Sequence, residues 1–263
     1  MPLATTPAPD LRPGDAYVQS FARGLEVIRS FSAVAPRQTL SEVAARSGLT
    51  RAGARRILLT LQSLGYVEGD GKQYALTPRI LDLGFAYLSS MPMWNRAEPV
   101  MEALVAEVKE SCSAAVLEGD DIVYVLRVPT RKIMSIGLGV GSRLPAYCTS
   151  LGRMLLASLD DEDLAQRLGT GPLPAHTKNT LTDPEAVLAK VRQARKQGWC
   201  LVNQELEEGL VSIAAPIVDR NGQAVAALNI SGQANRTPPR LMQESVLPPL
   251  LRAAQEISAK LAV

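Results

Sequence analysis

The segment from Thr39 to Leu76 constrains the fold more than any other part of the chain. Thr39-Leu-Ser-Glu42 has the S/T-x-x-E pattern of a helix capping box, and Gly48 stands where a left-handed residue would end that short helix. Thr50 can cap a second helix after a gap of about four residues, the length of a helix-turn-helix turn. Two short runs of strand-forming residues flank Gly69-Asp-Gly71 and predict a hairpin. Together these elements predict a winged helix-turn-helix over residues 17–77.

A further helix is expected before the capping box. Ser20 is the expected N-cap, and the helix is expected to begin at Phe21. Phe21, Leu25, Ile28 and Phe31 follow a helical spacing and predict a single apolar stripe.

The helix after Thr50 has two different faces. Its expected buried face is formed by residues spaced three and four apart, namely Ala54, Ile57, Leu58, Leu61 and Leu64. The opposite face carries Arg55 and Arg56, and Arg51 lies in the first turn. The N-terminal part of such a helix can enter the major groove of DNA, where arginine pairs with guanine or grips phosphate. The residues expected to contact DNA are Arg23, Thr50, Arg51, Ala52, Gly53, Arg55, Arg56 and Lys72.

The net charge of the chain says little about DNA binding, but the distribution of charged residues along the chain supports it. The net charge of the 263 residues is +2, yet residues 1–76 hold nine Lys/Arg against six Asp/Glu, and the remainder holds 19 against 20. Between residues 43 and 67 there are four arginines and no acid. A basic helix face by itself is more often simply solvated, but the order of the elements around this one favours DNA binding.

The length suits two domains, and the fold class expected is α+β. Residues 1–16 are rich in Pro, Ala and Thr and are expected to form a disordered tail. Thr77-Pro78 begins an expected linker helix over residues 78–91, with Pro at its first position. Residues 92–263 alternate between helix and strand patterns and predict a domain with a mostly antiparallel sheet. Asn221-Gly222 predicts a type I′ hairpin turn, and residues 133–138 are expected to form a strand.

Several classes of function are disfavoured by composition. The three cysteines form no CxxC pair and the chain has a single histidine, His176, so no disulfide framework, metal site or Ser-His-Asp triad is expected. There is no Walker or Rossmann glycine motif, no secretory signal and no apolar run long enough to span a membrane. We therefore expect a cytoplasmic protein that is not an enzyme and has no cofactor.

Polar residues stand in otherwise apolar segments of the second domain. Asn229 and Ser231 alternate on an expected strand and so share one face, Ser212 lies on another strand, and Tyr147, Thr149 and Ser150 stand at the start of a helix. Capping and turn chemistry could explain each residue singly. Together they suit a cavity with a few orienting polar groups.

Taken in order, these features resemble the IclR family of bacterial regulators. The resemblance covers Tyr17 to the C-terminus and is most specific at residues 40–50, at Gly65-Tyr-Val67, at residues 142–157 and at residues 198–216. Residues 17–28 and 127–134 resemble the branch that controls protocatechuate, 4-hydroxybenzoate and β-ketoadipate catabolism.

The resemblance implies a GAF-like effector-binding domain, a homodimer or a dimer of dimers, double-stranded operator DNA as one partner and a small organic, aromatic acid as the other. It carries the effector site onto Tyr147, Thr149, Ser150, Val202, Ser212, Asn229 and Ser231. Many family members have Asp where Val202 stands and His where Tyr147 stands. Val202 therefore makes its wall of the expected effector pocket more apolar than in those members, which suits an aromatic ring. Arg127 is the candidate partner of the effector's carboxylate, since an arginine fork matches a carboxylate. The equal alternative is that Arg127 is exposed at the end of a strand and binds nothing.

Three alternatives stay open at this point: a regulator of this family that answers a different small acid, an enzyme fused to a DNA-binding head, and a nucleoid-type protein that binds DNA broadly. Activator and repressor cannot be distinguished from the sequence.

Overall fold

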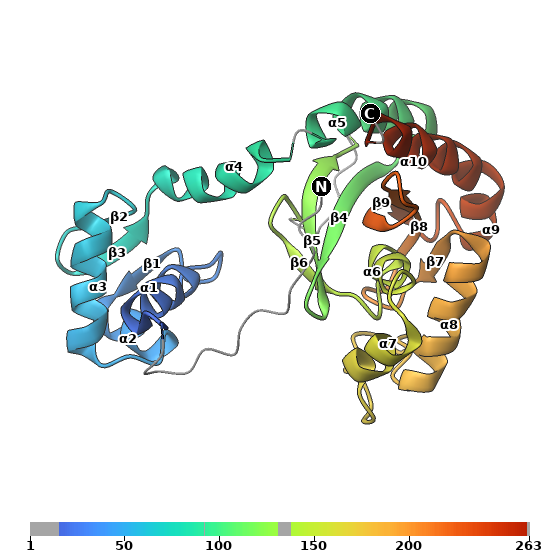
Figure 1. Ribbon diagram of the computed structural model, residues 1–263. Coiled ribbons are helices and arrows are strands. Elements are labelled where there is room, and N and C mark those ends of the chain that lie inside the picture. The colour runs from blue at the N-terminus through green and yellow to red at the C-terminus, as the bar shows by residue number, and fades with distance from the viewer. Residues whose placement is uncertain (1–15, 92, 131–137, 262–263) are drawn as a thin grey trace. The chain divides into compact units, whose positions relative to one another are not determined.

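A computed structural model describes residues 16–91, 93–130 and 138–261 (Figure 1). The chain divides into two compact units, Met1–Tyr87 and Leu88–Val263. Residues 1–15 of the tail expected over residues 1–16, and all but the last residue of the strand expected over residues 133–138, lie outside the described residues. No helix among the described residues combines the length and the apolar character that crossing a membrane requires.

The first unit contains three helices and a small antiparallel sheet. The helices are α1 (Gln19–Arg29), α2 (Leu40–Arg46) and α3 (Arg51–Ser63), and the strands β1 (Arg37–Thr39), β2 (Val67–Gly69) and β3 (Gln73–Leu76) pair in the order β1-β3-β2. A small apolar core holds the unit together and is formed by Val27, Val43, Ala44, Ala54, Leu58, Leu61, Val67 and Tyr74. The pairing of β1 with β3 was not expected from the sequence, because a three-residue strand has no readable periodicity.

The caps of α2 and α3 are those expected. The Thr39 hydroxyl accepts from the Glu42 amide while the Glu42 carboxylate accepts from the Thr39 amide, and Gly48 is left-handed at φ +65°. The Thr50 hydroxyl accepts from the Gly53 amide at 3.1 Å. Each cap satisfies amide groups that the first helical turn leaves unpaired.

The expectations for α1 and for the end of α3 were partly wrong. Helix α1 begins at Gln19 after Val18, which makes no side-chain cap, so Ser20 is not the N-cap. Of the α1 side chains only Val27 is buried, whereas Phe21 is 69% exposed. Leu64 is also exposed, because α3 ends at Ser63 and the chain then turns at Gly65. Helical spacing identifies an apolar stripe, but only the packed structure shows what covers it.

A short 3-10 turn, η1 (Pro78–Ile80), leads into α4 (Leu81–Ser89). None of the α4 residues is buried, although Leu81, Leu83, Phe85 and Tyr87 are large and apolar.

The second unit is built on a six-stranded sheet of order β6-β5-β4-β9-β8-β7 (Figure 1). Its pairings are antiparallel, and the strands are β4 (Ser111–Glu118), β5 (Asp121–Val128), β6 (Arg143–Pro145), β7 (Cys200–Asn203), β8 (Leu210–Val218) and β9 (Ala224–Gln233). Helices α5 (Met93–Val108) and α10 (Leu247–Leu261) cover one face of the sheet. Helix α6 (Ser150–Leu156) lies on the other face, together with α7 (Asp161–Leu168) and α8 (Pro184–Gln197).

Two local predictions need correction in this unit. The hairpin between β8 and β9 is not a type I′ turn, because that turn needs a positive φ at two residues and only Gly222 has one. Gly222 instead donates to the Asp219 carbonyl, and the register of the two strands shifts between Ile217 and Val218, so the hairpin has a bulge in its strands next to the turn. The sequence predicts a last helix from about Pro239 to Leu261, but α9 (Pro239–Leu241) is followed by a π-helical turn, η2 (Met242–Val246), before α10 begins. Pro248 and Pro249 explain it, since proline lacks the amide hydrogen that an α-helical ladder needs.

Candidate functional site

Helix α3 presents an open basic face. Ala54, Leu58 and Leu61 are buried on its inner side. Arg51, Ala52, Arg55 and Arg56 are exposed on its outer side, and none of the three arginines forms an ion pair with any residue that the structure describes. The guanidinium groups are therefore free to meet an anionic surface.

The other residues expected to contact DNA surround this face. Thr50 and Gly53 form the capped first turn of α3, and Lys72 is exposed in the turn between β2 and β3. The Asp70 carboxylate accepts from the backbone amides of Lys72 and Gln73, and these bonds hold the pKa of Asp70 below its usual value. Arg23 is exposed on α1. The Asp70 carboxylate thus caps the backbone of the turn that carries Lys72.

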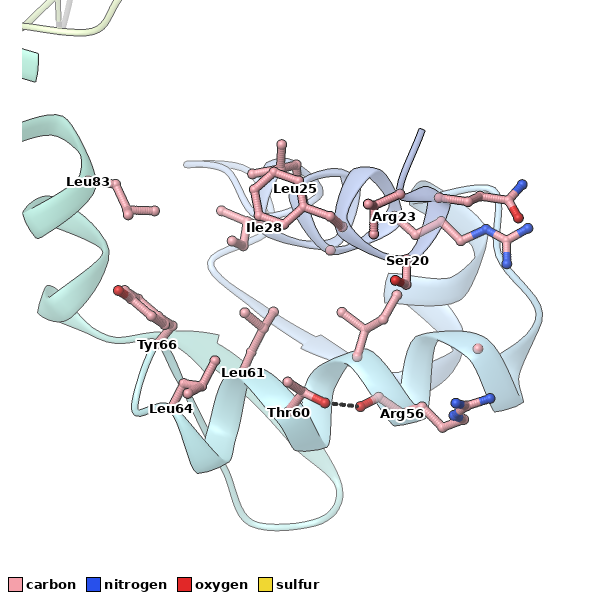
Figure 2. A pocket seen from close by; sticks show the side chains of 16 residues that line it. Ser20, Arg23, Leu25, Ile28, Arg56, Thr60, Leu61, Leu64, Tyr66 and Leu83 are labelled. Atoms are coloured by element: carbon pink, nitrogen blue, oxygen red, sulfur yellow. Dashed lines mark hydrogen bonds between the residues drawn. The ribbon is translucent and has the colours of Figure 1, made fainter. Parts of the chain in front are cut away.

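A groove of about 860 Å³ separates α1 from α3 (Figure 2). Figure 2 shows Leu25 and Ile28 of α1 facing Leu61 of α3 and Leu64 just after it, with Leu83 of α4 at one end of the groove. Arg23 and Arg56 lie at the opposite end. The apolar stripe predicted for α1 therefore lines an open groove instead of a closed core.

In the second unit, polar side chains gather on the face of the sheet that α6 covers. Residues directly opposite each other on paired strands point to the same side, and alternate residues along a strand do so too. Arg127 pairs with Ser113, Ser113 with Asn229, and Asn229 with Ala214. The next row consists of paired residues two positions along each strand, namely Ser111, Ser231, Ser212 and Val202. Since Ala214 and Val202 belong to the α6 side of the core, both rows face α6.

This polar patch is mostly buried. Ser150, at the start of α6, is 0% exposed and Asn229 is 3% exposed, while Arg127 and Ser231 are half-buried. The Asn229 amide nitrogen donates to the Ser231 hydroxyl at 3.0 Å. The Ser150 hydroxyl and the Asn229 amide oxygen are buried without a hydrogen-bond partner. Buried polar atoms are paired in the great majority of cases, so these two atoms are available to a bound molecule or to an ordered water.

Sequence reasoning missed Ser111 and Ser113. Both are buried and belong to the two polar rows. The Ser-x-Ser spacing at the start of β4 was the available signal, because it places both side chains on one face of a strand.

Tyr147 and Thr149 have other partners. The Thr149 hydroxyl donates to the Pro145 carbonyl and accepts from the Gly152 amide, both at 3.1 Å. The Tyr147 hydroxyl donates to the Pro174 carbonyl, and its ring lies 6.2 Å from that of His176. Tyr147 lines a separate cavity of about 320 Å³ together with Asp120, Arg167 and His176. Thr149 thus caps α6, and the structure does not place the Tyr147 hydroxyl among the polar rows.

A buried ion pair supports α6. The Arg153 guanidinium donates to the Glu205 carboxylate through two bonds of 2.7 and 2.6 Å, and its Nε donates to the Tyr147 carbonyl. Glu205 also accepts from the Leu181 amide. Arg153 is 1% exposed and Glu205 8%. The pair fixes the helix that carries Ser150 to the loop that follows Val202. The sequence signal was a charge inside the apolar run Leu151-Gly-Arg-Met-Leu155.

The cysteines do not supply reactive groups here. Burial raises the pKa of the Cys148 thiol to about 11 and that of Cys200 to about 12, and it raises the pKa of Cys112 as well. A thiol held neutral by burial is a poor nucleophile and a poor metal ligand. Within the described ranges no cluster of three or more His, Cys, Asp or Glu could hold a metal ion.

Comparisons with known proteins agree with this arrangement. Residues 20–71 match the model of the IclR helix-turn-helix domain, and residues 85–259 match that of the bacterial transcriptional regulator IclR C-terminal domain. The Pca regulon regulatory protein of Pseudomonas putida is 44% identical over 99% of this chain and 91% of its own length. The p-hydroxybenzoate hydroxylase transcriptional activator of Acinetobacter baylyi is 34% identical over 92% and 91%. The crystal structure of an IclR homologue from Microbacterium hydrocarbonoxydans, complexed with 4-hydroxybenzoate, superposes with a TM-score of 0.81 at 28% identity and covers 92% of this chain and 98% of its own.

Proposed function

Because the chain belongs to the IclR family of bacterial transcriptional regulators, we propose that it reads operator DNA through α3 and answers a small aromatic acid bound by its second unit. Like its relatives, it is a DNA-binding transcriptional regulator, and it is not an enzyme. We expect it to act in the cytoplasm, with the DNA that it would control.

The observation that carries the effector part of the proposal is the polar patch on the buried face of the sheet. Arg127 supplies a cation, and Ser113, Ser150, Ser212, Asn229 and Ser231 supply hydrogen-bonding groups in an otherwise apolar layer. Apolar walls with a few oriented polar groups suit an aromatic ring that carries a carboxylate. The relatives that regulate Pca and p-hydroxybenzoate genes, and the structure with 4-hydroxybenzoate, support the same class of ligand.

The DNA part of the proposal assigns direct contacts to α3. Arg51, Arg55 and Arg56 would face the major groove, with Thr50, Ala52 and Gly53 in the capped first turn. Lys72 of the wing and Arg23 of α1 would contact phosphates. The support is the exposure of these side chains above a leucine core.

We also assign a homodimer, or a dimer of dimers. Helix α4 carries exposed Leu81, Leu83 and Phe85, and the groove between α1 and α3 is lined with apolar side chains. Neighbouring exposed apolar side chains such as these are uncommon on the surface of a monomer. A second copy that covers it would bring two heads to two half-sites, spaced by one or more turns of DNA.

A salt titration of operator binding tests the DNA assignment. The full-length chain and its Arg55→Ala and Arg56→Ala variants would be titrated, by fluorescence anisotropy, into a duplex that the wild type selects from a random library. Loss of an arginine that reads a base should cost about 1–3 kcal/mol and relax the preference at one position. Loss of a phosphate contact should reduce the slope of log K against log salt by about one.

The matched control is Arg220→Ala, which removes the same charge from an exposed turn of the second unit. It should bind as the wild type does. Unchanged affinity and slope in both α3 variants would remove the assignment of this helix to DNA.

A further inference from the structure

One large apolar side chain of helix α3 lies outside both the core and the groove of the first unit. Leu59 is 48% exposed, whereas Leu58 and Leu61 are buried in the core. The groove between α1 and α3 is lined by Ile57 and Leu61 but not by Leu59. Packing within the unit therefore accounts for the other leucines of α3 and leaves Leu59 on the surface.

Helical geometry places Leu59 in the middle of the basic face. Seven residues are close to two full turns, so Ala52 and Leu59 lie on one line of the helix, within about 20° of each other. Arg55 and Arg56 lie to either side of this line, about 40° and 60° from Leu59. All four side chains are exposed, and the core is on the opposite side. The outward line of α3 is therefore an apolar strip, formed by Ala52 and Leu59, with an arginine on each side.

The polar side chains at the C-terminal end of α3 bond to backbone carbonyls of the same unit. The Thr60 hydroxyl donates to the Arg56 carbonyl at 3.0 Å (Figure 2), and the Ser63 hydroxyl donates to the Thr60 carbonyl at 2.8 Å. The Gln62 amide nitrogen donates to the Gly69 carbonyl of the wing at 3.1 Å. Base recognition at this end of the helix would therefore depend on the apolar strip more than on these polar groups.

A DNA duplex offers an apolar side chain very few partners. Phosphates are charged and hydrated, and the base edges in the major groove present hydrogen-bond donors and acceptors. The exception is the 5-methyl group of thymine, which is apolar and points into the major groove. The seven residues from Ala52 to Leu59 rise by about 10 Å, which is roughly three base-pair steps of a duplex. An apolar strip of this length can therefore meet the edge of a thymine.

We propose that Leu59 is a specificity-determining residue that packs on the 5-methyl group of a thymine in the operator half-site. Arg55 and Arg56, on either side of it, bind phosphate or guanine. The inference rests on the proposed function, which directs α3 into the major groove, and adds to it a base that is read by apolar contact. Because such a contact neutralises no phosphate, it acts independently of salt.

Substitution of single thymines by deoxyuridine tests this, since it removes only the methyl group and keeps the base pair. The duplex is the one that the wild type selects from a random library, and binding of the full-length chain is followed by fluorescence anisotropy. At one thymine of the half-site the wild type should bind about fourfold more weakly after the substitution, the value of burying one methyl group. Leu59→Ala should bind the two duplexes about equally, whereas Leu59→Met keeps an apolar side chain and should keep most of the difference.

Two further measurements separate this role from a structural or an electrostatic one. Leu59→Ala should leave the slope of log K against log salt unchanged, and circular dichroism should show a melting curve like that of the wild type, because Leu59 is exposed. Leu241→Ala is the control, since it makes the same chemical change at a position of the second unit that is 38% exposed. It should keep the full deoxyuridine effect.

Three results would overturn the role of Leu59 while leaving α3 on the DNA: a selected half-site without thymine, no deoxyuridine effect in the wild type, or an effect that persists undiminished in Leu59→Ala. Failure of the wild type to select any duplex would overturn the proposed function as well.

Discussion

At the scale of single residues, the second unit depends on a buried pair of opposite charges. Arg153 and Glu205 pair with each other, Arg153 also donates to the Tyr147 carbonyl just before α6, and Glu205 also accepts from the Leu181 amide. Such a pair contributes little net stability compared with apolar residues, but removal of one member leaves an uncompensated buried charge.

We expect Arg153→Met to lower the free energy of unfolding of the second unit by about 3–5 kcal/mol. Urea denaturation followed by tryptophan fluorescence would measure it, since both tryptophans, Trp94 and Trp199, lie in this unit. Arg143→Met is the control, because the Arg143–Asp121 pair is exposed and should cost less than about 1 kcal/mol. The double variant Arg153→Met/Glu205→Leu should recover part of the loss. Equal effects of the two arginine variants would contradict this account.

At the scale of elements, two hydrogen bonds and a cation–π contact join the end of the wing to the start of the segment that leads into α4. The Thr77 amide donates to the Tyr66 carbonyl at 3.0 Å, and the Thr77 hydroxyl donates to the Gly65 carbonyl at 2.5 Å. The Arg79 guanidinium lies 5.6 Å from the centre of the Tyr66 ring. Gly65, at φ +79°, leaves room for Arg79, which lies 3.1 Å from where a Cβ would stand. A rotation of α4 should therefore carry the wing and α3 with it.

Arg79→Ala should weaken that coupling. A cation–π contact at an exposed site contributes about 0.5–1 kcal/mol, so the change in operator affinity caused by the effector should shrink by about two- to fivefold. Operator titrations with and without 4-hydroxybenzoate would measure it, with Arg29→Ala as the control on exposed α1. An unaltered effector response would show that this contact takes no part in the coupling.

The layer between α6 and the sheet predicts a loss of stability at alkaline pH. Burial raises the pKa of Tyr147 from 10.0 to about 12, of Cys148 from 9.0 to about 11 and of Cys200 from 9.0 to about 12. A group whose folded pKa is raised stabilises the fold fully below its unfolded pKa, and that contribution is lost as pH rises through the folded value. The melting temperature should therefore fall from about pH 9 upward, and Cys200→Ala should reduce the steepness of that fall. A melting temperature independent of pH between 8 and 11 in the wild type would contradict the prediction.

At the scale of the whole molecule, assembly is expected to decide operator affinity. Phe85→Glu places a charge on the apolar surface of α4, where Phe85 is 69% exposed. We expect the variant to sediment as a smaller species than the wild type and to bind a two-half-site operator at least about tenfold more weakly, since the second head no longer gains from proximity. Val34→Glu is the control, because Val34 is 86% exposed in a loop of the same unit. Identical sedimentation of the wild type and Phe85→Glu would show that α4 is not the interface.

Local signals in the sequence determined the helices that have caps and the position of the basic face. Thr39, Glu42, Thr50 and Gly48 act within one turn of chain, so their hydrogen bonds and dihedral angles can be read without knowing the fold. The apolar back and arginine front of α3 likewise follow from helical spacing alone. Because alternate residues of a strand share one face, the sequence alone also places Asn229 and Ser231 on the same side of their strand.

Apart from the two hairpins, which local turn signals predicted, tertiary structure decided which strands are neighbours, and with them the composition of the candidate effector site. Ser113 and Asn229 are 116 positions apart in numbering, yet the β4–β9 register sets them side by side. The Arg153–Glu205 pair joins elements that no local pattern connects, and only the packed structure shows that Phe21 and Leu64 are exposed although helical spacing predicts both as part of a buried stripe. The physical reason is that a cap or a periodicity is satisfied by neighbours along the chain, whereas a buried charge, an unpaired amide oxygen or an open apolar groove is defined by what packs against it from elsewhere.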